Sequence, residues 1–167
     1  MRARERRAID QRMVQTERPA TPPTAPDGLA GRHVVFYDGV CGFCDRLVRF
    51  VLPRDRDERF RFATLQGDFA SATLMPLGAD PAQLDTFYVL ADYGTPRARL
   101  LDRSTAALFL AGQLGWPWRA AAALRILPKP LRDLGYRGVA RVRYRFFGRY
   151  DHCPVPSPEQ RARFVDS

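Results

Sequence analysis

Two cysteines that directly follow an apolar run constrain the fold of this chain more than any other feature. The run, residues 33–37, is rich in β-branched and aromatic side chains and predicts a buried strand. After a three-residue turn come Cys41 and Cys44, and the residues from there on predict a helix. Apolar side chains recur in it at steps of three and four: Phe43, Leu47, Phe50 and Val51. The sequence therefore predicts two thiols one helical turn apart at a helix start, which is the layout of a redox-active dithiol.

The place of each cysteine predicts its role. At a helix start, unpaired backbone N–H groups and the positive end of the dipole favour a thiolate over a thiol, and only the thiolate attacks a disulfide. We expect Cys41 to lie at the exposed edge of the helix start and to act as the nucleophile. Cys44, three residues on and beneath the first turn, is expected to be the resolving thiol that attacks a mixed disulfide.

Four neighbouring residues complete the predicted site. The Asp38 carboxylate could accept a proton from Cys44 or bond to N–H groups of the turn, and the sequence leaves both roles open. We expect substrate contacts from Gly42, which lets a partner's backbone approach closely, and from Phe43 and Tyr37. Residues between the cysteines tune the redox potential, so the sequence does not predict the direction of exchange.

Residues 37–44, Tyr-Asp-Gly-Val-Cys-Gly-Phe-Cys, resemble the Asp-x-x-Cys-x-x-Cys signature of the DCC family of thiol-disulfide oxidoreductase-like proteins. Later features fit the same family in the same order: Asp85-Thr86 before a strand, Ser104-x-Ala106 at a helix start, the Arg- and Tyr-rich segment 136–147 with Gly148, and Cys153-Pro154. The resemblance spans about His33 to Phe164. It implies a thioredoxin-like fold and an enzyme that exchanges dithiol and disulfide with a protein or small thiol substrate, with no cofactor.

Hydrophobic periodicity predicts the element order of such a fold without any motif. We expect strand 33–37, helix 41–52, strand 60–65, a short helix 68–75, hairpin strands 85–90 and 97–101, and a helix capped by Ser104. The order βαβ(α)ββα predicts a three-layer α/β fold around a central mixed sheet of about four strands.

Segments at both ends lie outside this unit. Residues 1–31 are rich in arginine, proline and threonine and predict a disordered tail, so the folded domain is expected over 32–167. An extension follows, with one helix from Trp116 to Leu127 and a second over about 130–147. We expect the inner face of this second helix to consist of its large apolar side chains: Leu131, Leu134, Val139, Val142 and Phe146.

Composition favours one domain in a reducing compartment. The 167 residues are 46% hydrophobic, which suits a single core. No apolar run approaches the ~18 residues of a membrane span, and the first 30 residues contain no apolar segment typical of a secretory signal. Three cysteines are too few for a disulfide scaffold, and Cys153 has no obvious partner. We therefore expect a cytoplasmic protein.

The net charge of +9 raises the question of nucleic-acid binding. All but one of the 27 basic residues are arginines, which is typical of arginine-rich coding and is weak evidence for a ligand. No zinc knuckle, RNA-recognition signature or recognition-helix pattern accompanies them, so nucleic-acid binding is not expected. Arg137, Arg141 and Arg145 step by four along one helix face. We expect that face to be solvated, or to contact an acidic partner or an anionic membrane surface.

Two alternatives to the enzyme remain open. Cys41, Cys44, His152 and Cys153 include the donor types of a Cys₃His zinc site. The last two are sequence neighbours that do not readily converge on one ion, and a second Cys-x-x-Cys pair is missing, so no metal is expected. The other alternative is a non-catalytic adaptor that keeps the fold and docks a partner through its basic face.

Overall fold

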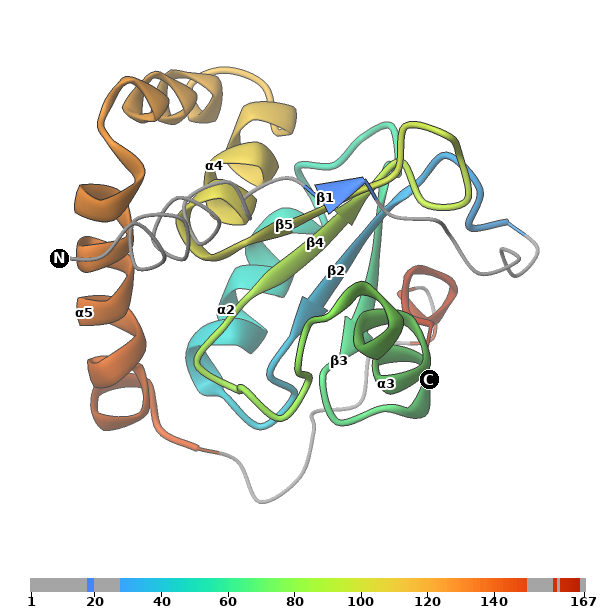
Figure 1. Cartoon of the computed structure of the whole chain (residues 1–167), viewed down its shortest axis with the longest axis horizontal. Helices are drawn as coiled ribbons and strands as arrows, with labels where there is room; N and C mark the ends of the chain where they lie inside the picture. The colour runs from blue at the N-terminus through green and yellow to red at the C-terminus, as the bar shows by residue number, and fades with distance from the viewer. Residues whose placement is uncertain (1–17, 20–27, 150–157, 159, 166–167) are drawn as a thin grey trace, which may run out of the picture.

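The computed structural model of the chain describes residues 18–19, 28–149, 158 and 160–165. Its strands form one sheet with helices on both faces (Figure 1). In chain order the elements are β1 (Arg18–Pro19), β2 (His33–Tyr37), α2 (Gly42–Val51), β3 (Phe60–Thr64), α3 (Asp68–Leu74), η1 (Met75–Leu77), β4 (Tyr88–Ala91), β5 (Arg99–Asp102), α4 (Arg103–Gln113), η2 (Trp118–Ile126), α5 (Lys129–Phe147) and η3 (Arg161–Arg163).

The sheet is mixed and has the strand order β1-β5-β4-β2-β3. Strands β2 and β3 are parallel, with Val35 opposite Phe62, because helix α2 carries the chain back along the sheet between them. Strand β4 pairs antiparallel with both β2 and β5. The predicted thioredoxin-like α/β fold is confirmed, with small shifts in the bounds of its strands.

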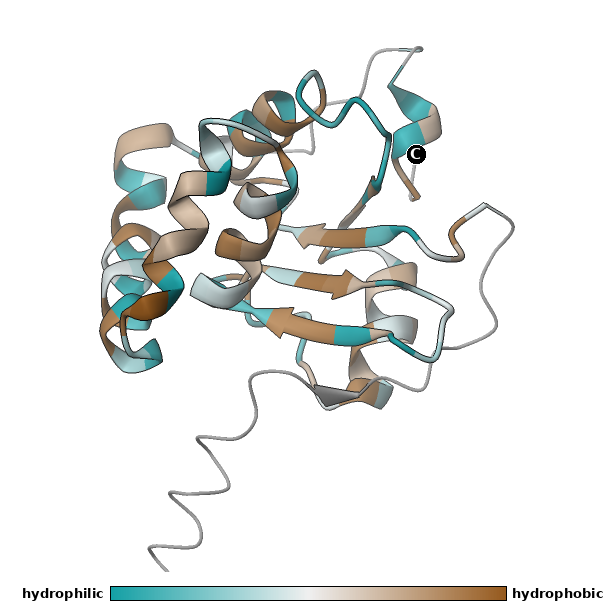
Figure 2. Cartoon of the chain, turned by 90° about the horizontal axis from the view of Figure 1, so that it is seen from above, coloured by the Kyte–Doolittle hydropathy of each residue, from teal (hydrophilic) through white to brown (hydrophobic). Residues whose placement is uncertain are grey.

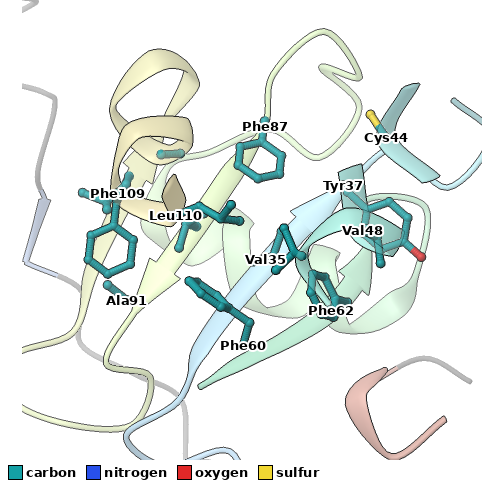
Figure 3. Close-up of a cluster of buried hydrophobic side chains, with 14 of the residues drawn as sticks. Val35, Tyr37, Cys44, Val48, Phe60, Phe62, Phe87, Ala91, Phe109 and Leu110 are labelled. Carbon is teal, nitrogen blue, oxygen red and sulfur yellow. The ribbon is translucent and has the colours of Figure 1, made fainter. Parts of the chain in front are cut away.

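Alternate side chains of β2 enter two cores on opposite faces of the sheet. Val35 and Tyr37 pack with side chains of α2 and α4, whereas Val34 and Phe36 pack with side chains of α3. Figure 3 shows the first of these cores, with Cys44 at its edge. The cysteine pair thus lies where a well-filled core meets the end of β2.

Helix α5 packs across α2 and α4 and leaves most of its large apolar side chains exposed. The five residues predicted for its inner face are all exposed, so that prediction was wrong: Leu131, Leu134, Val139, Val142 and Phe146. Polar side chains make the inner contacts instead. Tyr136 accepts the backbone N–H of Phe87 (2.9 Å), and Arg143 donates to the backbone carbonyl of Leu84. Apolar periodicity selected the wrong face because polar groups can be buried wherever they find hydrogen-bond partners.

The first half of α5 is held by the start of α4. Ser104, which was predicted to cap α4, is not its cap, because that helix begins at Arg103 after the N-cap residue Asp102. The Ser104 hydroxyl donates instead to the carboxylate of Asp133 in α5 (2.5 Å). Lys129 adds an ion pair to Asp102 (3.2 Å). These polar contacts hold the start of α5 against α4.

Ordered structure begins before the predicted domain boundary at residue 32. Arg18 and Pro19 form β1 and pair antiparallel with β5, at the edge of the sheet. Leu29 is buried in the core beneath α3, and the Gly31 N–H donates to the Tyr93 carbonyl (2.7 Å). Residues 1–17 and 20–27 of the predicted tail lie outside the described residues.

The first helix of the extension, η2, is a 3₁₀ helix that begins at Trp118. Trp118 packs edge-on against Phe50 of α2, with 4.8 Å between ring centroids. Phe50 lies at the opposite end of α2 from the cysteines, so this tryptophan has a packing role. Among the described residues, no helix combines the length and apolar character needed to cross a membrane.

His33 is predicted to make the fold sensitive to acid. It is buried at the start of β2, accepts the Asp92 N–H at Nδ1 (3.1 Å), and has its pKa lowered from 6.5, chiefly by burial. As pH falls from about 7.5 to about 5, the unfolded imidazole takes up a proton before the folded one, so the free energy of unfolding should fall. The His33→Gln variant keeps an acceptor but does not titrate. Urea unfolding should show a smaller loss of stability for this variant, and equal losses would contradict the prediction.

Candidate active site

The turn between β2 and α2 is held by the buried side chain of Asp38. One carboxylate oxygen accepts the Val40 N–H (3.2 Å) and a side-chain N–H of Gln66 (2.8 Å). Gln66 in turn accepts the Gly39 N–H (3.1 Å), and the Asp38 carbonyl accepts the Cys41 N–H (3.2 Å). Asp38 therefore fixes the loop, which was one of its two predicted roles. Its part in proton transfer stays a prediction.

Cys41 and Cys44 are free thiols at the start of α2, with Cys41 as the N-cap residue and Cys44 in the first turn. The exposed fraction is 0% for Cys41 and 7% for Cys44, so the prediction of an exposed Cys41 was wrong. The chain just beyond α5 covers it. Arg149 pairs with Cys41 in an antiparallel bridge, and the Gly148 carbonyl accepts the Gly42 N–H (3.3 Å).

The lack of a side chain at Gly42 allows the backbone at the end of α5 to lie this close to the start of α2. A Cβ atom at position 42 would collide with the backbone carbonyl of Phe147. The close backbone approach predicted for Gly42 is thus made by the chain itself. The neighbouring Phe43 ring packs against the Phe147 ring, with 5.1 Å between centroids. Substrate contact by Gly42 and Phe43 stays a prediction.

The two thiols differ strongly in acidity. A hydrogen bond from the Cys44 thiol to the Cys41 sulfur is the main cause that lowers the pKa of Cys41 to about 6. Burial acts in the opposite direction, while the N–H groups of residues 44 and 43 and the charge of Arg143 add to the lowering. The same hydrogen bond, together with burial, raises the pKa of Cys44. At neutral pH the pair is therefore one thiolate and one thiol that donates to it.

Two side chains of α5 that the sequence did not single out complete the site. Tyr144 donates its hydroxyl hydrogen to the second carboxylate oxygen of Asp38, and burial is the main cause that raises the Tyr144 pKa. The guanidinium of Arg143 lies 3.6 Å from the same oxygen and donates to the Tyr144 hydroxyl (3.1 Å). Both members of the Asp38–Arg143 ion pair are buried. The sequence did contain a signal for this ion pair. A buried aspartate requires a partner, and Arg143 lies outside the four-residue spacing of Arg137, Arg141 and Arg145.

A cavity of about 260 Å³ lies beside the cysteine pair, between α2, α5 and the segment before β4. Cys44 forms part of its wall, whereas most of the rest is apolar. Both Tyr37 and Phe43 line it, as do Leu84 and Thr86 of the segment before β4. An apolar group of a substrate could occupy this cavity next to the sulfur of Cys44.

Comparison with known proteins identifies the family. Residues 35–149, which include the whole site, match the model of the DCC1-like thiol-disulfide oxidoreductase family. The chain belongs to this family. The family resemblance noted in the sequence is thereby confirmed, and the family name indicates a redox role with thiol or disulfide substrates.

Two relatives of this DCC1-like protein show how widely the similarity extends. The uncharacterized protein YuxK of Bacillus subtilis (strain 168) is 33% identical over 132 residues, which cover 79% of this chain and 93% of the relative. A chloroplastic DCC family protein of Arabidopsis thaliana is 31% identical over 125 residues, which cover 74% and 70%. No solved structure matches the chain.

The zinc site considered in the sequence would need His152 and Cys153 as ligands beside Cys41 and Cys44. His152 and Cys153 lie outside the described part of this DCC1-like chain. Within the described part, no group of three or more His, Cys, Asp or Glu side chains is arranged to hold a metal ion. The geometry therefore brings together Cys41, Cys44 and Asp38 of the predicted site, and adds Arg143 and Tyr144 to them.

Proposed function

We propose that this DCC1-like protein exchanges dithiol and disulfide with its substrates through Cys41 and Cys44. The observation that carries the proposal is the placement of two free thiols at the start of α2, with Cys41 as the N-cap residue and Cys44 in the first turn. The pKa shifts agree with it, because the interaction with Cys44 lowers the Cys41 pKa to about 6 while the Cys44 pKa is raised. The difference in pKa gives the two cysteines different roles. Cys41 is the thiolate that attacks, and Cys44 keeps its proton until the second step.

The proposed reaction has two displacement steps. The Cys41 thiolate attacks one sulfur of a substrate disulfide, so a mixed disulfide forms and the other substrate sulfur leaves as a thiolate. Cys44 then loses its proton to the substrate thiolate released in the first step and attacks the Cys41 sulfur, which forms the Cys41–Cys44 disulfide and frees the second substrate thiolate. The substrate gains two electrons and the protein loses them, and the reverse sequence oxidises a dithiol substrate.

Attack by Cys41 requires the backbone cover beyond α5 to open. We infer that a substrate main chain takes the place of Gly148 as acceptor of the Gly42 N–H, because a backbone carbonyl already occupies that position. An apolar substrate side chain would then enter the cavity lined by Tyr37 and Phe43. This arrangement is the proposed basis for substrate contact by these three residues.

Trapping of a mixed disulfide tests the proposal. In a Cys153→Ser background, the Cys44→Ser variant is incubated with insulin, whose disulfides serve as the substrate. We expect an insulin adduct, visible by intact-mass spectrometry and released by dithiothreitol, because Cys41 attacks but nothing resolves the product. The matched Cys41→Ser variant should give little or no adduct, since Cys44 is buried and burial still raises its pKa. Equal adducts from both variants would refute the assigned roles.

The complete burial of Cys41 favours one alternative, a non-catalytic adaptor with this fold. Under that alternative, replacing both cysteines by serine leaves the protein's function unchanged. Under the proposal it abolishes insulin reduction by dithiothreitol-recycled protein. We further propose that the protein works in a reducing compartment such as the cytoplasm, since its three cysteines do not provide a disulfide scaffold.

A further inference from the structure

The exposed large apolar side chains of the described residues gather on one side of the fold. All but Met75 belong to η2, α5 and the short segments next to them: Trp116, Trp118, Leu124, Ile126, Leu127, Leu131, Leu134, Val139, Val142 and Phe146. We call this set the η2–α5 surface. Ile126 is 88% exposed, Trp116 83% and Phe146 74%. The helices that carry it stand out from the sheet in Figure 2, with apolar and polar residues alternating along them.

Soluble domains seldom leave so many large apolar side chains together in water, so the η2–α5 surface calls for a partner. The inner face of α5 is polar and already bonded, through Asp133, Tyr136, Arg143 and Tyr144. Leu124, Leu127 and Leu131 line a pocket with residues of α4, and Val139 lines the cavity beside Cys44. Leu134, Val142 and Phe146 line neither and are exposed along a helix about 28 Å long, at 1.5 Å per residue.

Along this stretch of the chain the charge is almost all of one sign, although Trp116 and Trp118 share a pocket with Asp55 and Asp57. Between Trp116 and Arg149 there is one acidic residue, Asp133, and it is bonded to Ser104. The exposed residues Arg137, Arg141 and Arg145 flank the apolar side of α5. A partner that binds the η2–α5 surface must therefore offer both an apolar region and negative charge.

We propose that the η2–α5 surface binds an anionic lipid bilayer. A second copy of the chain would bring the same positive surface against it. The chain's own residues 1–17 also carry a net positive charge, with five arginines against two glutamates and one aspartate. A bilayer with anionic headgroups satisfies both requirements, since arginines meet the phosphates while apolar side chains enter the boundary between headgroups and acyl chains.

In the docked state α5 lies in the plane of the membrane interface. Trp116, at the start of the surface, suits the headgroup level, where tryptophan side chains are enriched. The chain beyond α5 lies directly on Cys41, so docking places the cysteine pair close to the membrane. The binding proposal does not depend on the proposed redox function, because it involves neither cysteine.

Vesicle binding of the full chain tests this proposal. We expect the protein to sediment with vesicles that contain about one third phosphatidylglycerol at about 0.1 M salt, and not with pure phosphatidylcholine vesicles. Both tryptophans of the chain belong to the η2–α5 surface, so their fluorescence should shift to the blue on the anionic vesicles. A cooperative urea unfolding transition shows that each variant is folded, whether or not the redox function holds.

Matched substitutions separate the two contributions to binding. Ile126→Gln with Phe146→Gln should abolish sedimentation, whereas Met75→Gln, at an apolar position elsewhere that is 64% exposed, should not change it. Arg141→Gln should weaken binding about fivefold, at ~1 kcal/mol per basic residue near an anionic surface. Arg97→Gln removes the same charge from an exposed position in the loop between β4 and β5 and should have no such effect.

Three results would overturn the proposal. One is no sedimentation with anionic vesicles. Another is binding that survives Ile126→Gln with Phe146→Gln, which would show that the apolar side chains take no part. The third is concentration-dependent dimerisation in sedimentation velocity that these two substitutions remove, which would make a second copy the occupant.

Discussion

The Cys44→Ala variant is expected to lose the low pKa of Cys41. The hydrogen bond from Cys44 is the largest cause of the value of about 6, and burial already acts to raise it. With the donor removed, the Cys41 pKa should rise by about two units or more, toward or beyond the ordinary value near 8.5. The fraction of Cys41 present as thiolate at pH 7 should then fall from about nine-tenths to about one-tenth or less.

The matched Cys44→Ser variant should keep the low pKa. A serine hydroxyl at position 44 can donate to the Cys41 sulfur much as the thiol does, so the thiolate of Cys41 retains its principal partner. The comparison therefore isolates one hydrogen bond, because both variants remove the resolving thiol.

Titration of thiolate absorbance near 240 nm is the appropriate measurement. Cys41 is fully buried, so alkylation rates would report opening of the cover as well as ionisation. A less basic thiolate is also a weaker nucleophile, which would offset part of any difference in rate. Both variants carry Cys153→Ser, so only one cysteine titrates. A midpoint that stays near 6 in Cys44→Ala would mean that the helix N–H groups and Arg143 suffice to hold the thiolate.

Local patterns in the sequence predicted most of the fold. The apolar run of β2 and the three- and four-residue spacing in α2 depend on neighbours in the chain, and both elements appear where they were expected. The same holds for the place of the two cysteines at the helix start. Such patterns report which residues need burial, and in a short α/β unit few arrangements meet that need.

What the sequence did not predict depends on contacts between distant segments. Cys41 is covered by backbone near Gly148, and a backbone contact leaves no side-chain pattern beyond the glycine at position 42. The orientation of α5 is a second case. Arg143 and Tyr144 point inward because Asp38 lies there, about a hundred residues earlier in the chain. Periodicity weighs each residue by hydrophobicity alone and does not reveal such a pairing.

Asp38→Asn is expected to destabilise the protein by about 3–5 kcal/mol, because it leaves the Arg143 guanidinium buried without a compensating charge. Urea unfolding measures the loss. The exposed pair formed by Asp57 and Arg59 provides the control, and Asp57→Asn should cost no more than about 1 kcal/mol. Equal costs for the two substitutions would show that the buried pair is not needed to hold α5.

Replacing the other member of the pair separates stability from chemistry. Arg143→Met should also destabilise the fold, and combined with Asp38→Asn it should cost less than the sum of the two, since no unpaired buried charge remains. The thiol titration should differ between them. Arg143 lowers the pKa of Cys41, so Arg143→Met raises that pKa, whereas Asp38→Asn leaves the guanidinium in place and does not. A rise in both variants would mean that the low pKa depends on the position of α5 as a whole. A rise in Arg143→Met alone would show that one arginine both anchors the helix and stabilises the thiolate beneath it.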